Sequence, residues 1–333
     1  MKYDIFVDGA LYTVEPFSFT QPFSDGHLPR MGGKLYIQSS SIRGKLRRLA
    51  RDVIYETMGY AKLPLADFYF LTLGGVKSGK TESEKESEDK LVVNKVMAVR
   101  EKNPLVSLFG AMAPQTIPGR LMVSHAIAMN DIHPDTVKHV RTNDLMRSPD
   151  VVEMLDDSAL ADYVAMKNEA DIRSKASADI KAKQVHLRKL DKSSDAYATL
   201  NAEIQALKKE KDGMTQVQVG LPNLEYEVIP QGATLSSRFI LSGVTEREIV
   251  LFFKAMDKFS QNPQLGAKAN HGLGVISGEW DVRIRSAGTP METAGRLTFA
   301  GDYMPAQATG KVREWIDAPL DLSGCNFSAE LAA

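Results

Sequence analysis

The sequence is 333 residues long, which is enough for one elaborated domain or two average ones. Hydrophobic residues make up 43% and charged residues 25%, so the composition excludes a wholly disordered chain. The single cysteine, Cys325, excludes an internal disulfide framework and a cysteine-rich metal site, and no segment approaches the roughly eighteen apolar residues of a membrane span. We therefore expect a cytoplasmic protein that has no contact with a membrane.

Basic residues are unevenly distributed along the chain. The formal net charge is -1, from 41 basic and 42 acidic residues. Between Gly26 and Arg51, however, no acidic residue occurs, and the basic residues in this stretch are Arg30, Lys34, Arg43, Lys45, Arg47, Arg48 and Arg51. A local field of this kind attracts polyanions whatever the net charge is, so nucleic acid is a candidate partner.

The first predicted elements are strands followed by a helix. Residues 2–17 alternate imperfectly between apolar and polar side chains and predict one or two strands, broken at Asp8-Gly9. After a loop rich in glycine and proline, we expect a short strand at 34–38 and a helix over 39–59.

This helix carries its apolar and basic residues on different faces. Its apolar residues recur at the spacing of a buried stripe, namely Ile42, Leu46, Leu49 and Val53. The hydroxyls of Ser39, Ser40 and Ser41 can cap its first turn. A row of arginines at i, i+4 and i+8 is expected to point away from the core, and it consists of Arg43, Arg47 and Arg51, with Lys45 and Arg48 beside them. Hydroxyls and amides at a helix N-terminus bind anions, so this face predicts polyanion binding.

The next segment contains three apolar runs and one acidic stretch. Residues 67–73 resemble a strand, and further strands are predicted at 91–99 and 119–129. Residues 74–90 have many glutamates and few large apolar side chains, so we expect a mobile loop there.

The composition changes at about residue 151. Residues 151–211 are rich in Ala, Lys, Asp and Glu at helical spacing and predict two helices, separated at 191–195, with Ser194 as the N-cap of the second. This pair of helices looks inserted between two strand-like arms.

The last third resumes an alternating order of strand and helix. We expect a strand at 233–241, a helix at 245–259 with Thr245 and Glu248 in a capping box, and a strand at 274–284. The complete order matches the split βαβ plan, so the predicted fold class is α+β, with an antiparallel sheet and two helices on one face.

The octet Gly74–Thr81 (GGVKSGKT) matches the phosphate-binding pattern GxxxxGK[ST]. The glutamate-rich stretch that follows does not resemble the helix that this pattern requires, so the match is weak evidence for a nucleotide site. The sequence contains no catalytic or metal-ligand constellation. Asp25 and His27 are most simply explained as residues of a turn. We therefore expect no enzyme activity, no cofactor and no metal.

A second glycine-rich segment, 266–274 (GAKANHGLG), precedes the last predicted strand. It is either a plain connection or a loop whose bare amides, together with Lys268 and His271, approach a phosphodiester backbone closely.

Several segments occur together in an order that resembles a known family. They are IQSSSIRGKLRRLARDVIYE, PLVSLFGAM, GRLMVSHAIAM and GAKANHGLGVISGEW, which together span Ser39 to Trp280. They resemble the backbone subunits of class 1 CRISPR effector complexes, the RAMP superfamily. The length of the chain and the pattern of its composition are most like those of the type IV branch. The resemblance implies a modified RRM-like, or ferredoxin-like, palm with a β-hairpin thumb and an inserted helical hairpin.

The resemblance also implies a division of the chain. Residues 1–140 form the first half of the palm, with the mobile loop at 74–90. Residues 141–230 form the thumb, with the helical insertion at 151–212. Residues 231–333 form the second half of the palm and a C-terminal tail.

By this resemblance, the family's RNA-binding positions fall on three segments. The helix start and the glycine loop would hold guide phosphates, and the thumb would insert an apolar wedge that displaces a base. The residues are Ser39, Ser40, Ser41, Arg43, Lys45, Arg47 and Arg51 of the helix, Lys268, Asn270 and His271 of the loop, and Arg141, Leu145, Met146 and Arg147 of the thumb. Asp25 lies near the aspartate with which type III relatives cut target RNA, but its neighbours do not match, so we expect no cleavage.

The function implied is that of a guide-RNA-binding backbone subunit. Its partners would be crRNA, a target nucleic acid paired with the guide, further copies of itself in a helical filament, and other subunits of the effector complex. Two alternatives remain open at this point, a P-loop NTPase or phosphotransferase that uses Gly74–Thr81 and a protein scaffold built on the helical hairpin.

Overall fold

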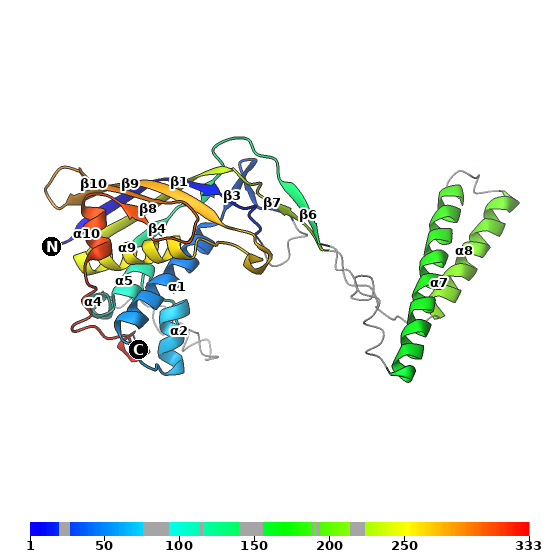
Figure 1. The fold of residues 1–333 in the computed structure, drawn as a ribbon, viewed down its shortest axis with the longest axis horizontal. Helices are drawn as coiled ribbons and strands as arrows, with labels where there is room; N and C mark the ends of the chain where they lie inside the picture. The colour runs from blue at the N-terminus through cyan, green and yellow to red at the C-terminus, as the bar shows by residue number, and fades with distance from the viewer. Residues whose placement is uncertain are drawn as a thin grey trace. The chain divides into compact units, whose positions relative to one another are not determined.

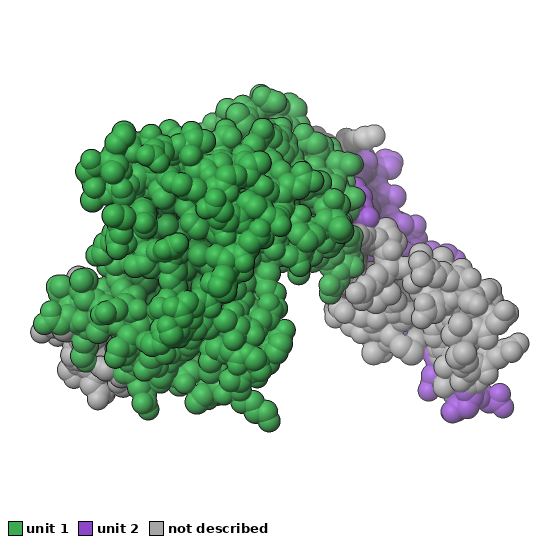
Figure 2. All heavy atoms as spheres, turned by 60° about the vertical axis from the view of Figure 1, so that its left-hand side comes forward, with its two compact units in different colours: residues 1–137, 226–333 green, residues 138–225 purple. Residues whose placement is uncertain are grey.

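The computed structural model describes residues 1–19, 27–75, 93–113, 116–139, 156–187, 190, 194–213 and 224–332 (Figure 1). The chain divides into two compact units, one formed by residues 1–137 and 226–333 and the other by residues 138–225 (Figure 2). Of the loop expected at 74–90, only Gly74 and Gly75 are among the described residues. No helix in the described part of the chain has the length and apolarity needed to cross a bilayer.

The first unit is built on a six-stranded sheet in the order β11-β10-β9-β1-β8-β4, in which every neighbouring pair is antiparallel. The strands are β1 (Tyr3–Thr13), β4 (Leu121–Val123), β8 (Thr234–Val244), β9 (Ile276–Ser286), β10 (Glu292–Phe299) and β11 (Gln307–Ala308). The break expected at Asp8-Gly9 is wrong, because β1 continues through both residues. Glycine is needed there because a Cβ would lie 1.9 Å from the carbonyl oxygen of Glu279 on β9.

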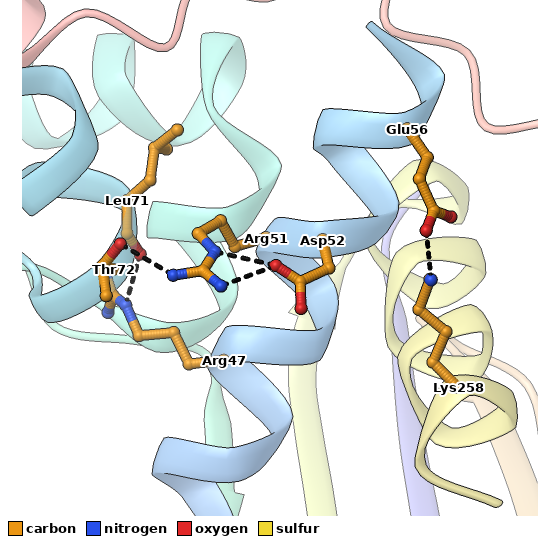
Figure 3. A network of polar contacts seen from close by, with 7 residues as sticks. All are labelled: Arg47, Arg51, Asp52, Glu56, Leu71, Thr72 and Lys258. Carbon is orange, nitrogen blue, oxygen red and sulfur yellow. Dashed lines mark hydrogen bonds and ion pairs between the residues drawn. The ribbon is translucent and has the colours of Figure 1, made fainter. Parts of the chain in front are cut away.

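Two helices cover one face of this sheet, α1 (Ser39–Thr57) and α9 (Glu246–Gln261) (Figure 1). In chain order the unit reads β1-α1-β4-β8-α9-β9, and these four strands lie side by side as β9-β1-β8-β4. This arrangement is the split βαβ plan, so the predicted ferredoxin-like palm is confirmed. Lys258 of α9 forms an ion pair with Glu56 of α1, which joins the two helices at their exposed edges (Figure 3).

The core lies between the sheet and the two helices. The predicted stripe of α1 is buried there, as are Phe239 of β8, Phe252 of α9 and Trp280 of β9. The ring centroid of Phe239 lies 5.8 Å from that of Phe252 and 6.0 Å from that of Trp280. Each fully buried side chain of this size stabilises the fold by about 1.5–3 kcal/mol, so this contact joins sheet and helix layers strongly.

Two segments expected to be strands are helices. Residues 67–73 belong to α2 (Leu65–Leu73), and residues 91–99 fall largely in α4 (Val93–Lys102). The buried residues of α4 are Val96 and Val99, whose spacing of three places both on one side of a helix. Packing against the neighbouring helices therefore overrides the strand propensity of these short apolar runs.

The remaining elements of the first unit are short. The strand expected over 119–129 is two strands, because β4 joins the large sheet whereas β5 (Ala126–Ile127) pairs with β3 (Lys34–Ile37) in a second sheet of order β2-β3-β5. The other elements are β2 (Arg30–Met31), α5 (Pro104–Phe109), β7 (Leu224–Val228), the 3-10 turn η2 (Ala269–His271), α10 (Lys311–Asp317) and the 3-10 turn η3 (Ala329–Ala332).

The second unit contains the two predicted helices, α7 (Asp157–Leu187) and α8 (Asp195–Gly213), which pack against each other. Ser194 caps α8 as predicted, since its Oγ accepts a hydrogen bond from the amide of Tyr197 at 3.1 Å. The hairpin is inserted between β6 (Asp135–His139) and β7, which form a two-stranded sheet. The capping box expected for α9 is also present, with Thr245 and Glu248.

The arginines of α1 differ most from expectation. Arg47 is 8% exposed, and its guanidinium donates a hydrogen bond to the carbonyl of Leu71 at 2.8 Å (Figure 3). It donates a second one to the carbonyl of Phe70 at 2.9 Å, also at the end of α2. It also donates to the carbonyl of Gly110 (2.7 Å) at the end of α5. The expectation that this side chain points away from the core is therefore wrong.

Arg43 behaves in the same way. Its guanidinium donates to the carbonyls of Phe109 and Leu121, both at 2.8 Å. Burial lowers the pKa of both arginines, that of Arg47 to about 10, so each remains charged at neutral pH. A helix C-terminus carries partial negative charge and free carbonyls, which is why two arginines are held here without carboxylate partners.

We predict that Arg47→Leu destabilises the protein by about 3 kcal/mol or more, because the carbonyls at two helix ends would then be buried without donors. Urea denaturation measures the change. Arg48→Leu, at the next position and exposed, is the matched control and should stay within about 0.5 kcal/mol of the parent protein. We call the contacts of Arg47 with the ends of α2 and α5 the clamp. Equal losses of stability in the two variants would contradict its role.

Candidate nucleic-acid interface

A groove of about 670 Å³ runs between the start of α1 and the glycine loop, which are far apart in the sequence. The loop, residues 266–274, connects α9 to β9. The described residues that line the groove are Phe19, Ser40, Ser41, Gly44, Lys45, Arg48, Thr72, Leu73, Asn262, Gln264, Leu265, Gly266, Ala267 and Ala269. The structure thus brings together the two palm segments that sequence analysis predicted to bind phosphates.

The serines at the start of α1 do not have the expected capping role. The N-cap residue is Gln38, whose side chain makes no capping bond, and the amide of Ser39 donates to Nδ1 of His125 at 3.1 Å. The hydroxyls of Ser40 and Ser41 instead line the groove. Oγ of Ser40 donates to Oε1 of Gln38 at 3.3 Å, whereas the Ser41 hydroxyl has no such partner among the described residues and is available to an anion at this helix N-terminus.

Two cations line the groove, Lys45 and Arg48. Lys45 is half-buried with its Nζ 5.9 Å from the ring centroid of Phe259, and this burial lowers the pKa of Lys45 to about 8. Arg48 is exposed and has no ion-pair partner within the described part of the chain. The groove therefore contains positive charge that the described residues do not neutralise.

Sequence analysis omitted Arg48 from the candidate site because it followed the row Arg43, Arg47 and Arg51. A different spacing identifies it. Ser41, Lys45 and Arg48 stand at i, i+4 and i+7 and therefore share one face of the helix, and this is the face that lines the groove.

The other predicted cation of α1, Arg51, is already paired. It forms an ion pair with Asp52 at 2.6 Å and donates to Oγ1 of Thr72 at 3.1 Å (Figure 3). Its guanidinium carbon lies 5.9 Å from the ring centroid of Phe68. Of the four basic residues of this helix that were predicted to bind RNA, Arg43, Lys45, Arg47 and Arg51, only Lys45 is among the described residues that line the groove.

The glycine loop contributes backbone rather than the predicted side chains. Gly266, Ala267 and Ala269 line the groove, and the amide of Ala267 donates to the carbonyl of Ser18 at 3.0 Å. Asn270 and His271 are exposed in the 3-10 turn η2 and are not among the described lining residues. Glycine is needed at 266 because its φ is +88° and a Cβ would lie 2.5 Å from the same carbonyl of Ser18.

Lys268 points elsewhere. Its Nζ lies 2.9 Å from the ring centroid of Tyr226 on β7, and its φ of +63° belongs to the left-handed region. The side chain is therefore engaged by an aromatic ring in this structure.

The described part of the octet Gly74–Thr81 does not have the structure that a phosphate-binding loop requires. Gly74 ends α2 in a left-handed conformation, and the amides of Gly74 and Gly75 donate to the carbonyls of Phe70 and Tyr69, both at 3.1 Å. The motif thus follows a helix C-terminus, whose dipole disfavours phosphate, and not a strand. Residues 76–81 lie outside the described residues.

The sheet face opposite the helices carries ion pairs. Asp8 pairs with Arg238 and with Arg283 (2.6 Å), Asp4 pairs with Arg285 (2.8 Å), and these arginines lower the pKa of both carboxyls. Glu279 and Arg296 form a further pair at 2.6 Å. Charges on this face neutralise one another, so it differs from the groove.

Some predicted residues cannot be placed, because Asp25, Arg141, Leu145, Met146 and Arg147 lie outside the described residues. Within the part of the chain that the structure describes, no three His, Cys, Asp or Glu side chains gather as a metal site requires.

Comparison with known proteins adds a family and a structural neighbour. A family model described as the RAMP superfamily matches residues 24–277. A chain of a solved type IV-B CRISPR complex is similar at 15% sequence identity and a TM-score of 0.42, with 87% of this chain and 92% of that chain covered. Among curated proteins, no sequence matches this chain.

We predict that His125→Ala destabilises the start of α1 by about 1 kcal/mol, because the amide of Ser39 loses its acceptor. Urea denaturation again provides the measurement. His133→Ala, an exposed histidine between β5 and β6, is the control and should change stability little. If both substitutions have the same effect, His125 does not support the helix start.

Proposed function

Because this chain belongs to the RAMP superfamily, we propose that it is a guide-RNA-binding backbone subunit of a class 1 CRISPR effector complex, of the type IV branch. Copies of the chain assemble along crRNA and present it for pairing with a target nucleic acid, beside other subunits of the complex. The groove between α1 and the glycine loop is the observation that carries this proposal.

The chemistry of the groove suits a phosphodiester backbone. Lys45 and Arg48 supply positive charge, Ser41 supplies a hydroxyl donor, and the α1 N-terminus adds its dipole. Such contacts fix the position of a strand without distinguishing its bases. This is what a subunit needs if every copy binds a different stretch of one guide.

The other predicted residues have different roles in this proposal. Arg43 and Arg47 act indirectly, since Arg47 holds α1 against the ends of α2 and α5 and Arg43 holds it against α5 and β4. The thumb residues Arg141, Leu145, Met146 and Arg147 keep the wedge role that the family resemblance suggests, as a part of this proposal that rests on sequence.

We assign no catalytic step to this chain. The alternative P-loop function loses support, because the amides of Gly74 and Gly75 that would hold a phosphate are bonded to α2 carbonyls. Asp25 is not proposed as a nuclease residue, since its sequence surroundings differ from those of cleaving relatives.

Removal of both groove cations should weaken RNA binding. For Lys45→Met with Arg48→Met we expect an affinity at least about tenfold lower, and a salt slope shallower by about 0.7 for each phosphate of a single strand that is no longer neutralised. Fluorescence anisotropy with a labelled single-stranded RNA, titrated at several salt concentrations, measures both quantities. Lys311→Met with Arg313→Met removes equal charge from α10 and is the matched control. Equal slopes in the two double variants would rule out the groove as the RNA site.

Binding should also depend on pH through Lys45. A phosphate stabilises the protonated form, so Lys45 contributes fully at pH values below its free pKa of about 8, and the contribution is lost as pH rises above that value. We therefore expect constant affinity from pH 6.5 to 7.5 and a decline by about pH 9. Lys45→Arg should remove this decline because a guanidinium stays charged. If the RNA affinities of the parent protein and of Lys45→Arg change with pH in the same way, Lys45 does not contact phosphate.

A further inference from the structure

Lys268 is held in a backbone conformation that side-chain-bearing residues rarely adopt. Its φ of +63° lies in the left-handed region, where the Cβ crowds its own backbone. The residue starts the 3-10 turn η2, since its carbonyl accepts a hydrogen bond from the amide of His271 at 2.8 Å. The turn therefore depends on an interaction that compensates the strain at Lys268.

Tyr226 provides that interaction. The Nζ of Lys268 lies 2.9 Å from its ring centroid, an arrangement in which the cation faces the negative π surface. The ring itself is fixed, because Tyr226 is 8% exposed and packs with Val228 and Leu273 in a separate small core beside Val137. Leu273 belongs to the far end of the glycine loop, so Tyr226 holds the loop at two points.

The strand that carries Tyr226 also contacts the segment that leads to α1. Glu227 is the next residue of this strand after Tyr226. Its Oε2 accepts a hydrogen bond from the amide of Leu28 at 2.9 Å, and its Oε1 pairs with Nδ1 of His27 at 3.0 Å. These residues lie on the chain that leads through β2 and β3 into α1. On the other side, the loop held by Tyr226 supplies Ala267 and Ala269 to the groove.

We propose that Tyr226 is a positioning residue for guide binding, which acts through Lys268 to hold the glycine loop in the conformation that lines the groove. The proposal rests on the RNA-binding function proposed above and goes further by assigning Lys268 a role other than phosphate contact. It also makes β7 an element that shapes the groove.

The first test needs no RNA. Hydrogen exchange of the full-length protein, followed over residues 265–274, reports how firmly the loop is held. Tyr226→Leu keeps apolar packing against Leu273 but removes the π face, so we expect exchange to be about fivefold faster, as removal of a cation–π interaction of ordinary strength would produce. Tyr226→Phe keeps the ring and should exchange as the parent protein does. Unchanged exchange in Tyr226→Leu would overturn the proposal.

The second test uses labelled single-stranded RNA and a double-mutant cycle. Tyr226→Leu and Lys268→Gln should each weaken binding about fivefold, the double variant should be no weaker than either, and the salt slope should stay at the parent value. Additive losses, or a slope shallower by about 0.7 in Lys268→Gln, would show that Lys268 contacts a phosphate directly and would overturn the proposal. A parent protein that fails to bind RNA would overturn the proposed function instead, and the exchange experiment would still decide the role of Tyr226.

Discussion

The clamp formed by Arg47 is the interaction on which the rest of the structure depends. The last carbonyls of a helix have no partners within it, and two such helix ends meet at this guanidinium. A cation with several donors in one plane can satisfy both, which a neutral side chain of similar size could not do. The clamp fixes α1 beside α2 and α5, and the opposite face of α1 is thereby left to form one wall of the groove.

The distribution of charge explains how a chain of net charge -1 can bind a polyanion. On the open face of the sheet, arginines are paired with carboxylates such as Asp4 and Asp8, so this face has little field of its own. On α1, the guanidinium groups of half-buried Arg43 and buried Arg47 donate hydrogen bonds to backbone carbonyls. The groove cations Lys45 and Arg48 have no carboxylate partner among the described residues, so a phosphate bound there would supply a counter-charge.

The glycine loop and the serine-rich helix start cooperate although more than two hundred residues separate them. The loop brings backbone, and glycine at 266 allows that backbone to approach Ser18 closely. The helix brings charge and hydroxyl groups. β7 contacts the loop through Tyr226 and the entry to β2 through Glu227.

Local patterns in the sequence determined several features of this protein. The stripe of Ile42, Leu46 and Leu49 identifies a buried helix, Thr245 and Glu248 identify the start of another, and the alternation of strands and helices indicates the split βαβ plan. These features depend on side chains within a few positions of one another, so periodicity is enough to recognise them. The order of four motifs likewise placed the chain near its family.

Only the tertiary structure decided which charges are free. A helical wheel shows that Arg47 and Arg48 leave different faces of α1, but it does not show that the ends of α2 and α5 pack against one of those faces. The same holds for Lys268, whose partner Tyr226 stands 42 residues earlier in the chain. A long cationic side chain takes whichever partner folding brings within reach, whether carbonyl, carboxylate or aromatic ring, and that choice is made by contacts distant in sequence, on which local patterns carry no information.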